Sequence, residues 1–143
     1  MNAVVSGLPA AANDLSATLG FVRVVSLEPG RAAVEYACGM HMCHSGGVAQ
    51  GGFVAGWIDA AMAHAVMAKF GHDPVPISLE LKISYFAPAN PGVVLATGWI
   101  EAGGKSTLFA EGTLHDAAGK LLAKGTSTVR MIPVARVSAM AGG

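Results

Sequence analysis

The chain has 143 residues, of which 52% are hydrophobic and 13% are charged, and its formal net charge is zero. This length is typical of one domain, and the balanced charge disfavours nucleic acid as a partner because phosphate binding requires a basic face. Two cysteines are too few for a disulfide framework, so we expect a reducing, cytoplasmic environment.

The two ends of the chain carry little patterning. Residues 1–13 have no basic segment followed by an apolar core, so they do not resemble a signal peptide. We expect them to form a loose tail that leads into a short helix between Asp14 and Leu19. The last ten residues are small, and we expect them to be frayed. The prediction is a single domain over 1–143, with its core at about 20–131 and flexible termini.

Most of the remaining sequence has strand character. Two strands are predicted within residues 20–38, joined at the turn sequence Glu28-Pro29-Gly30. A third is predicted at 77–86, where apolar and polar residues alternate strictly and Ser78 falls on the polar face. Three more strands follow at about 93–102, 105–116 and 120–132.

A long apolar helix is predicted from Gly52 to Phe70, with Gly71 ending it. Its length is near the lower limit for a membrane span. Asp59, His64 and Lys69 interrupt the apolar sequence, however, so we predict a core helix and no membrane association. Because short turns join the strands, they should pair antiparallel, and the helix should cover one face of the sheet. The predicted class is α+β, with about six strands wrapped around one central helix.

One side of this helix combines small residues with a carboxylate. At 100° per residue, Asp59 shares its face with a series of glycines and alanines: Gly52, Ala55, Gly56, Ala60 and Ala63. Small side chains allow a ligand or a second chain to approach the backbone closely. A hydrogen-bonded structural role is the alternative for Asp59.

The start of the helix predicts a site for a negative oxygen. The first amides of a helix have no internal partners and lie at its positive end, and Gly51 and Gly52 would leave them bare. Asp59 lies roughly 10 Å further along the axis, which is too far to serve the same carbonyl group within one subunit. A second copy of the helix could supply the missing half.

Three segments together resemble one family, the hot-dog fold acyl-CoA thioesterases of the phenylacetic-acid-degradation type. They are GGVAQGGFVAGWIDAAMAHAV (46–66), ISLELKISYFAPANPG (77–92) and GGKSTLFAEGTLHDAAGKLLAKGTSTV (103–129). The most specific features are the Gly-Gly pair followed by a carboxylate and the strand ending in Y-F-x-P-A. The resemblance implies a sheet wrapped around the helix, edge-to-edge dimers that pair into tetramers, and active sites at the dimer interface.

The resemblance also implies roles for individual residues. Asp59 occupies the position of the catalytic carboxylate, which acts as nucleophile or as general base. Gly51 supplies the amide that polarises the thioester carbonyl, and Ser78 supplies an assisting hydroxyl. Two positions depart from the family pattern, because Gln50 replaces the usual histidine and His44 replaces the usual asparagine. Gln50 can donate a hydrogen bond to the thioester oxygen but carries no charge, and His44 could position water or be exposed.

Substrate contacts are predicted at Gly52, Lys82 and Lys105, the two lysines being candidates for CoA phosphates with simple solvation as the alternative. The segment CGMHMCH (38–44) gathers two cysteines and two histidines, but its spacing matches no usual zinc site. We therefore expect no metal and no cofactor.

The predicted function is hydrolysis of an aryl or medium-chain acyl-CoA to free acid and CoA. A hot-dog hydratase or dehydratase is one alternative. It is disfavoured because such enzymes pair an acidic residue with a histidine, whereas Asp59 and His64 point about 140° apart on the helix. A non-catalytic acyl-CoA binding module is the other alternative, since the usual histidine is missing.

Overall fold

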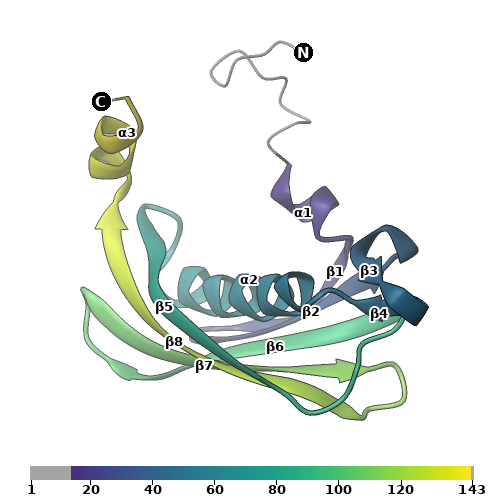
Figure 1. Cartoon of the computed structure of the whole chain (residues 1–143). Coiled ribbons are helices and arrows are strands. Elements are labelled where there is room, and N and C mark those ends of the chain that lie inside the picture. Colours follow the sequence, from purple (N-terminus) through teal and green to yellow (C-terminus); the bar gives the residue numbers. More distant parts are fainter. Residues whose placement is uncertain (1–13, 143) are drawn as a thin grey trace.

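The computed structural model describes residues 14–142, so the tail predicted at 1–13 lies outside the described residues. One six-stranded antiparallel sheet curves around the central helix α2 (Gly51–Phe70), which lies in its concave face (Figure 1). The strand order is β1-β2-β6-β7-β8-β5. The strands are β1 (Phe21–Glu28), β2 (Arg31–Cys38), β5 (Pro74–Tyr85), β6 (Gly92–Gly103), β7 (Thr107–Asp116) and β8 (Leu121–Pro133). The predicted α+β class is confirmed.

Helix α2 begins one residue earlier than predicted, with Gln50 as its N-cap, and ends at Gly71, whose φ of +81° favours glycine. Its large apolar side chains are buried against the sheet, as Trp57, Ile58 and Met62 illustrate. The face with Asp59 and the small residues points away from this contact and is mostly half-buried. The helix pattern predicted from the sequence is therefore the one observed.

A row of glycines lets the helix lie close to the sheet. Gly98, Gly112 and Gly125 are direct partners across β6, β7 and β8. A Cβ atom built on Gly98 would lie 2.5 Å from the backbone carbon of Ala61 in α2, a distance that real side chains do not adopt. Larger residues here would force the helix away from the sheet and move every group that it carries.

Strand β5 contains an irregularity that the sequence pattern did not predict. Ser78 pairs with Val129 and Glu80 with Thr128, so Leu79 is an extra residue in a β-bulge. The bulge reverses the alternation, so that Ser78 before it and Tyr85 after it both contact α2. The predicted strict alternation is wrong at this point, and Ser78 lies on the helix side of the strand.

The remaining elements are short. Helix α1 (Leu15–Thr18) has Asp14 as its N-cap, and the Trp57 indole donates to the carbonyl oxygen of Leu19. Residues 39–49 contain two 3-10 turns, η3 (Met40–Met42) and η4 (Ser45–Gly47), and a small ladder of β3 (Cys43–His44) and β4 (Val48–Ala49).

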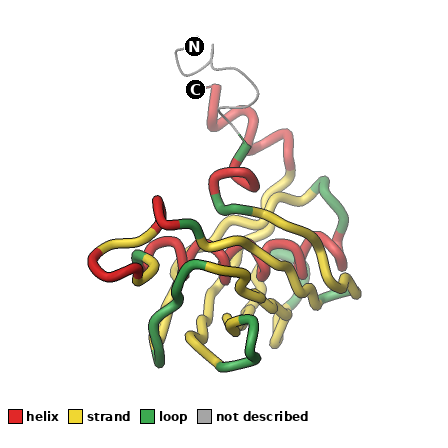
Figure 2. The backbone as a smooth tube through the Cα atoms, turned by 90° about the vertical axis from the view of Figure 1, so that its right-hand side faces the viewer, coloured by secondary structure: helices red, strands yellow, loops and turns green. Residues whose placement is uncertain are grey.

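The end of the chain differs from the expected frayed segment. Residues Val134–Gly142 form helix α3, which extends away from the sheet after β8 (Figure 2). Among the helices of residues 14–142, none is both long enough and apolar enough to cross a membrane.

Candidate active site

Asp59 lies on the small-residue face of α2 and is held by a serine from the neighbouring strand. The Ser78 hydroxyl donates to Oδ1 of Asp59 at 2.8 Å. Within residues 14–142, the second carboxylate oxygen has no hydrogen-bond partner. The arrangement fixes the orientation of the carboxylate and leaves one oxygen available to a ligand or to water.

Asp59 borders a cavity of about 430 Å³, which we call the carboxylate cavity. Side chains from α2, β2, β5 and the α1 segment line it, among them Leu19, Tyr36, Asp59, His64, Met67 and Pro76. Most of this lining is apolar. Such a cavity suits an apolar group attached to the carbonyl that reacts at the carboxylate.

The start of α2 leaves one free amide rather than two. The side-chain oxygen of Gln50 accepts a hydrogen bond from the Gly52 amide at 2.7 Å, and the Gln50 carbonyl accepts from the Phe53 amide at 2.9 Å. The Gly51 amide has no acceptor within residues 14–142. Gly52 is therefore capped, and Gly51 alone presents a donor at the positive end of the helix.

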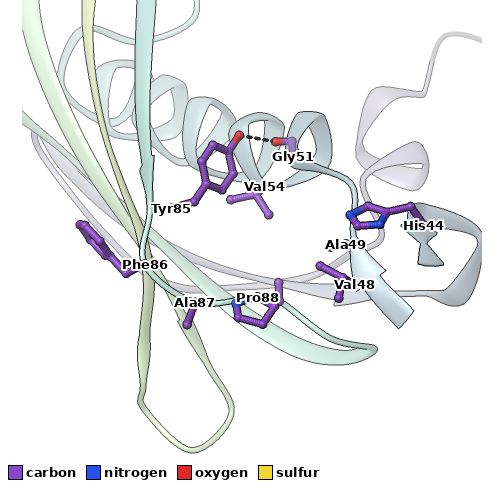
Figure 3. A pocket seen from close by; sticks show the side chains of 10 residues that line it. His44, Val48, Ala49, Gly51, Val54, Tyr85, Phe86, Ala87 and Pro88 are labelled. Atoms are coloured by element: carbon purple, nitrogen blue, oxygen red, sulfur yellow. Dashed lines mark hydrogen bonds between the residues drawn. The ribbon is translucent and has the colours of Figure 1, made fainter. Parts of the chain in front are cut away.

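A second cavity, of about 480 Å³, lies at this helix start and is called here the amide cavity. Its lining includes His44, Val48, Gly51, Val54, Tyr85 and Phe86 (Figure 3). The Tyr85 hydroxyl donates to the Gly51 carbonyl oxygen at 2.7 Å, and His44 borders the cavity on the side opposite Tyr85 (Figure 3). The structure thus brings Gly51 and His44 together.

The carboxylate and the free amide line different cavities of one chain. They are eight residues apart on α2, which corresponds to roughly 12 Å along the helix axis. One chain therefore does not place Asp59 and the Gly51 amide around a single carbonyl group. This agrees with the separation expected from the sequence.

The two lysines lie elsewhere. Lys82 is exposed on β5, and Lys105 is exposed in the turn between β6 and β7. Neither lines the carboxylate cavity or the amide cavity. Their predicted contacts with CoA remain predictions.

The cysteines and histidines of residues 38–44 form no metal site in this structure. The sulfur atoms of Cys38 and Cys43 are 3.9 Å apart, and both residues are free thiols. Burial raises the pKa of the Cys38 thiol to about 11. In the described part of the chain, no cluster of three or more His, Cys, Asp or Glu side chains could hold a metal ion.

Three residues that border the cavities had no role in the sequence-based site. Tyr85 lies in the Y-F-x-P-A segment, but only the bulge in β5 turns it toward Gly51. Tyr36 carried no signal beyond its place in a strand. The third is His64, whose angle to Asp59 on the helix disfavours direct pairing, although both side chains border one cavity.

A six-stranded antiparallel sheet wrapped around one long helix is the architecture of hot-dog fold thioesterases. A sequence profile of the Thioesterase superfamily matches residues 46–123, which is more than half of the chain. The chain belongs to this superfamily. The predicted fold family and enzyme class are both confirmed.

Three relatives illustrate the likeness. The chain is 33% identical over 104 residues to a Saccharolobus solfataricus protein named as an esterase, covering 72% of this chain and 73% of the relative. It is 28% identical over 119 residues to acyl-coenzyme A thioesterase 13 of Homo sapiens, covering 82% and 84%. The crystal structure of a phenylacetic acid degradation-related thioesterase from Ralstonia eutropha matches with a TM-score of 0.76 at 26% identity, covering 87% and 92%.

Proposed function

We propose that the protein hydrolyses acyl-CoA thioesters to a free acid and CoA, at a site that two copies of the chain build together. Asp59 and Ser78 come from one copy, and the Gly51 amide comes from the partner. The observation that carries this proposal is the pair of half-sites on α2: an oriented carboxylate in one cavity and a single free amide in another.

The geometry of β5 supports the shared site. This strand pairs with β8 along one edge only, and its other edge ends the sheet. Ser78 contacts Asp59 and Tyr85 contacts Gly51. If two β5 strands pair antiparallel about an axis between Leu81 and Lys82, Ser78 of one copy lies opposite Tyr85 of the other. That register brings the carboxylate of each copy toward the amide of its partner.

The exposed side chains of this edge also support a homodimer, which could pair further into a tetramer. Leu79 is 56% exposed and Phe86 is 57% exposed in the single chain. Large apolar side chains exposed on and beside a free strand edge suit a contact with a second copy of the chain.

In the proposed reaction, the thioester carbonyl accepts a hydrogen bond from the Gly51 amide, which stabilises the negative charge that develops on its oxygen. The free oxygen of Asp59 either removes a proton from an attacking water molecule or attacks the carbonyl carbon itself. The carbon–sulfur bond breaks, and CoA leaves as a thiol. Water supplies the oxygen and the hydrogens that the two products gain.

The mostly apolar lining of the carboxylate cavity beside Asp59 supports aryl or medium-chain acyl-CoA thioesters as the substrates. The side-chain NH₂ group of Gln50 remains available for the thioester, since only its oxygen caps the helix. His44 is suited to positioning water in the amide cavity. Lys82 and Lys105, which are exposed outside the two cavities, are proposed to bind the CoA phosphates.

The test is release of free thiol from a panel of short, medium, long and aryl acyl-CoAs, with Asp59→Asn as the matched variant. Removing a nucleophile or base commonly lowers kcat by about 10²-fold or more, and the nearly isosteric amide should leave the fold intact. If Asp59 is structural, the variant instead loses thermal stability and keeps its turnover. Loss of an enoyl chromophore without thiol release would favour a hydratase, and calorimetric binding without turnover would favour a binding module.

A further inference from the structure

The two cysteines of the chain lie close together in the segment that leads to the start of α2. Cys38 ends β2 and Cys43 begins β3, and their sulfur atoms are 3.9 Å apart. The sequence contains no other cysteine, so each has a single possible thiol partner within the chain. Both are free thiols, and an S–S bond of about 2.05 Å would require the sulfur atoms to approach by roughly 1.9 Å. The pair therefore has the proximity that an internal disulfide needs.

The two thiols differ in exposure and in protonation. The Cys43 thiol donates its one hydrogen to the Gly39 carbonyl oxygen at 3.5 Å, so the hydrogen between the two sulfur atoms belongs to Cys38. Cys38 is 4% exposed, and burial raises the pKa of its thiol to about 11, so it stays protonated at neutral pH. Cys43 is half-buried and is reached more easily from solvent. An external disulfide should therefore react first at Cys43, with Cys38 already in contact to complete the exchange.

Formation of the bond should move the Cys43 side of the pair. Cys38 is held in the six-stranded sheet, where it pairs with Gly92 of β6. Cys43 belongs to the two-residue ladder of β3 and β4, in which it pairs with Ala49. Residues 39–42 between the cysteines contain the 3-10 turn η3. The larger sheet is the more rigid support, so most of the approach falls on residues 39–43.

This segment is bonded to the start of α2. The Met42 carbonyl oxygen accepts from the amide of Gln50 at 2.9 Å, and Gln50 is the N-cap of the helix. His44, the residue after Cys43, lines the amide cavity (Figure 3). A shift of Cys43 therefore reaches both the cap and the cavity that present the Gly51 amide.

We propose that Cys38 and Cys43 form a reversible internal disulfide that lowers the activity of the site at the start of α2. The Cys43 thiolate attacks one sulfur of a low-molecular-weight disulfide, which gives a mixed disulfide and releases one thiol. Cys38 then loses its proton and attacks the Cys43 sulfur, which releases the second thiol and leaves the Cys38–Cys43 bond. The protein loses two electrons and two protons, and the external disulfide gains them as two thiols.

The bond should be reversible because it closes a short loop, and short loops stabilise a disulfide less than long loops do. The effect on hydrolysis rests on the proposed function, whereas formation of the disulfide does not. The two parts can therefore be tested separately.

The test exposes the reduced protein to oxidised glutathione and removes all glutathione before each measurement. The intact mass should fall by two hydrogen atoms, both thiols should become untitratable, and dithiothreitol should restore them. We expect kcat for thiol release from acyl-CoA to fall by about tenfold or more and to recover on reduction, since small displacements in an active site are costly. Independently of activity, the Gln50 amide should exchange its hydrogen faster in the oxidised protein, as measured by NMR.

Two single-cysteine variants serve as controls. Cys38→Ala should accumulate a mixed disulfide with glutathione on Cys43, because the second step is blocked. Cys43→Ala should stay unmodified, because the remaining thiol of Cys38 is buried. Its turnover should not respond to oxidised glutathione. Cys43→Ala keeps the test decisive if Cys38→Ala does not fold.

The outcomes separate this inference from the proposed function. Retention of both thiols, or a disulfide between two chains on a non-reducing gel, would overturn the proposal. An internal disulfide that leaves turnover unchanged would refute the regulation, as would an equal loss of turnover in Cys43→Ala. If no acyl-CoA releases thiol from the reduced protein, the proposed function fails. The mass and the Gln50 exchange then still decide whether the disulfide forms and whether it alters the helix start.

Discussion

Gly51 contributes a backbone amide, so most substitutions at this position do not remove the group that matters. Proline does remove it, and proline is well tolerated at the first position of a helix, which Gly51 occupies. The preceding Gln50 already has the extended backbone that a following proline requires, with φ −63° and ψ 138°. Gly51→Pro is therefore a direct deletion of the free amide.

Gly51→Ala is the matched control. A Cβ at this position would lie 3.0 Å from the Tyr85 hydroxyl, and both variants introduce this same close contact. We expect Gly51→Pro to lower kcat by about 10²–10³-fold relative to Gly51→Ala, as for the loss of one oxyanion donor. Steady-state kinetics and thermal melting of the two variants check this. Equal turnover of the two would remove the Gly51 amide from the mechanism.

The sequence predicted some of these residue-scale features and not others. The face shared by Asp59 and the small residues followed from the regular 100° rotation per residue of a helix, which α2 adopts over Gly51–Phe70. The cap formed by Gln50 was not predicted, because Ser, Thr, Asp and Asn are the usual N-cap residues. The contact of Ser78 with Asp59 was not derivable either, since it depends on a bulge that strict alternation does not indicate.

At the scale of elements, the sheet has two free edges, β1 and β5, and our account assigns dimerisation to β5. Each edge offers a leucine of nearly equal exposure in the single chain: Leu27 on β1 at 55% and Leu79 on β5 at 56%. Substitution of such exposed side chains changes the stability of the subunit only slightly. The two positions therefore form a matched pair.

We expect Leu79→Asp to shift the protein toward monomers and to reduce thiol release, because it places a charge in the β5 contact of both copies. Leu27→Asp should preserve the oligomer and the activity. Sedimentation velocity at assay concentration, together with turnover, measures both effects. Dissociation by Leu27→Asp and not by Leu79→Asp would move the interface to β1 and refute the proposed register.

The element order was largely predictable, and the exceptions have physical causes. The predicted antiparallel pairing of successive strands holds for β1–β2, β6–β7 and β7–β8. It is wrong for β5 and β6, because β5 pairs with β8 and β6 pairs with β2. Helix α3 was missed because its small residues resemble a loose tail. The β3–β4 ladder was missed because two-residue strands have too little alternation to detect.

At the scale of the whole molecule, two buried groups predict alkaline sensitivity. Burial raises the pKa of Tyr36 from 10.0 to about 12 and that of Cys38 from 9.0 to about 11. Above pH 9, the unfolded chain therefore loses these protons before the folded protein does. The stability that the two groups contribute is present below pH 9 and is lost as pH rises toward 11 and 12.

We accordingly expect the free energy of unfolding in urea to fall between pH 8 and pH 11. Tyr36→Phe should remove the part of this decline that begins above pH 10. Denaturation curves of both proteins at several pH values measure it. Parallel declines in the two proteins would show that Tyr36 does not contribute.

The central claim is that each active site combines Asp59 of one copy with Gly51 of the partner. The most direct test is thiol release by dimers assembled from two inactive chains, Asp59→Asn and Gly51→Pro, co-expressed with different tags and purified through both. A two-fold dimer of this kind contains one intact site and one doubly defective site, so the purified mixed dimer should recover about half of the activity of the unmodified dimer. Mixed dimers that stay as inactive as either parent would contradict the shared site.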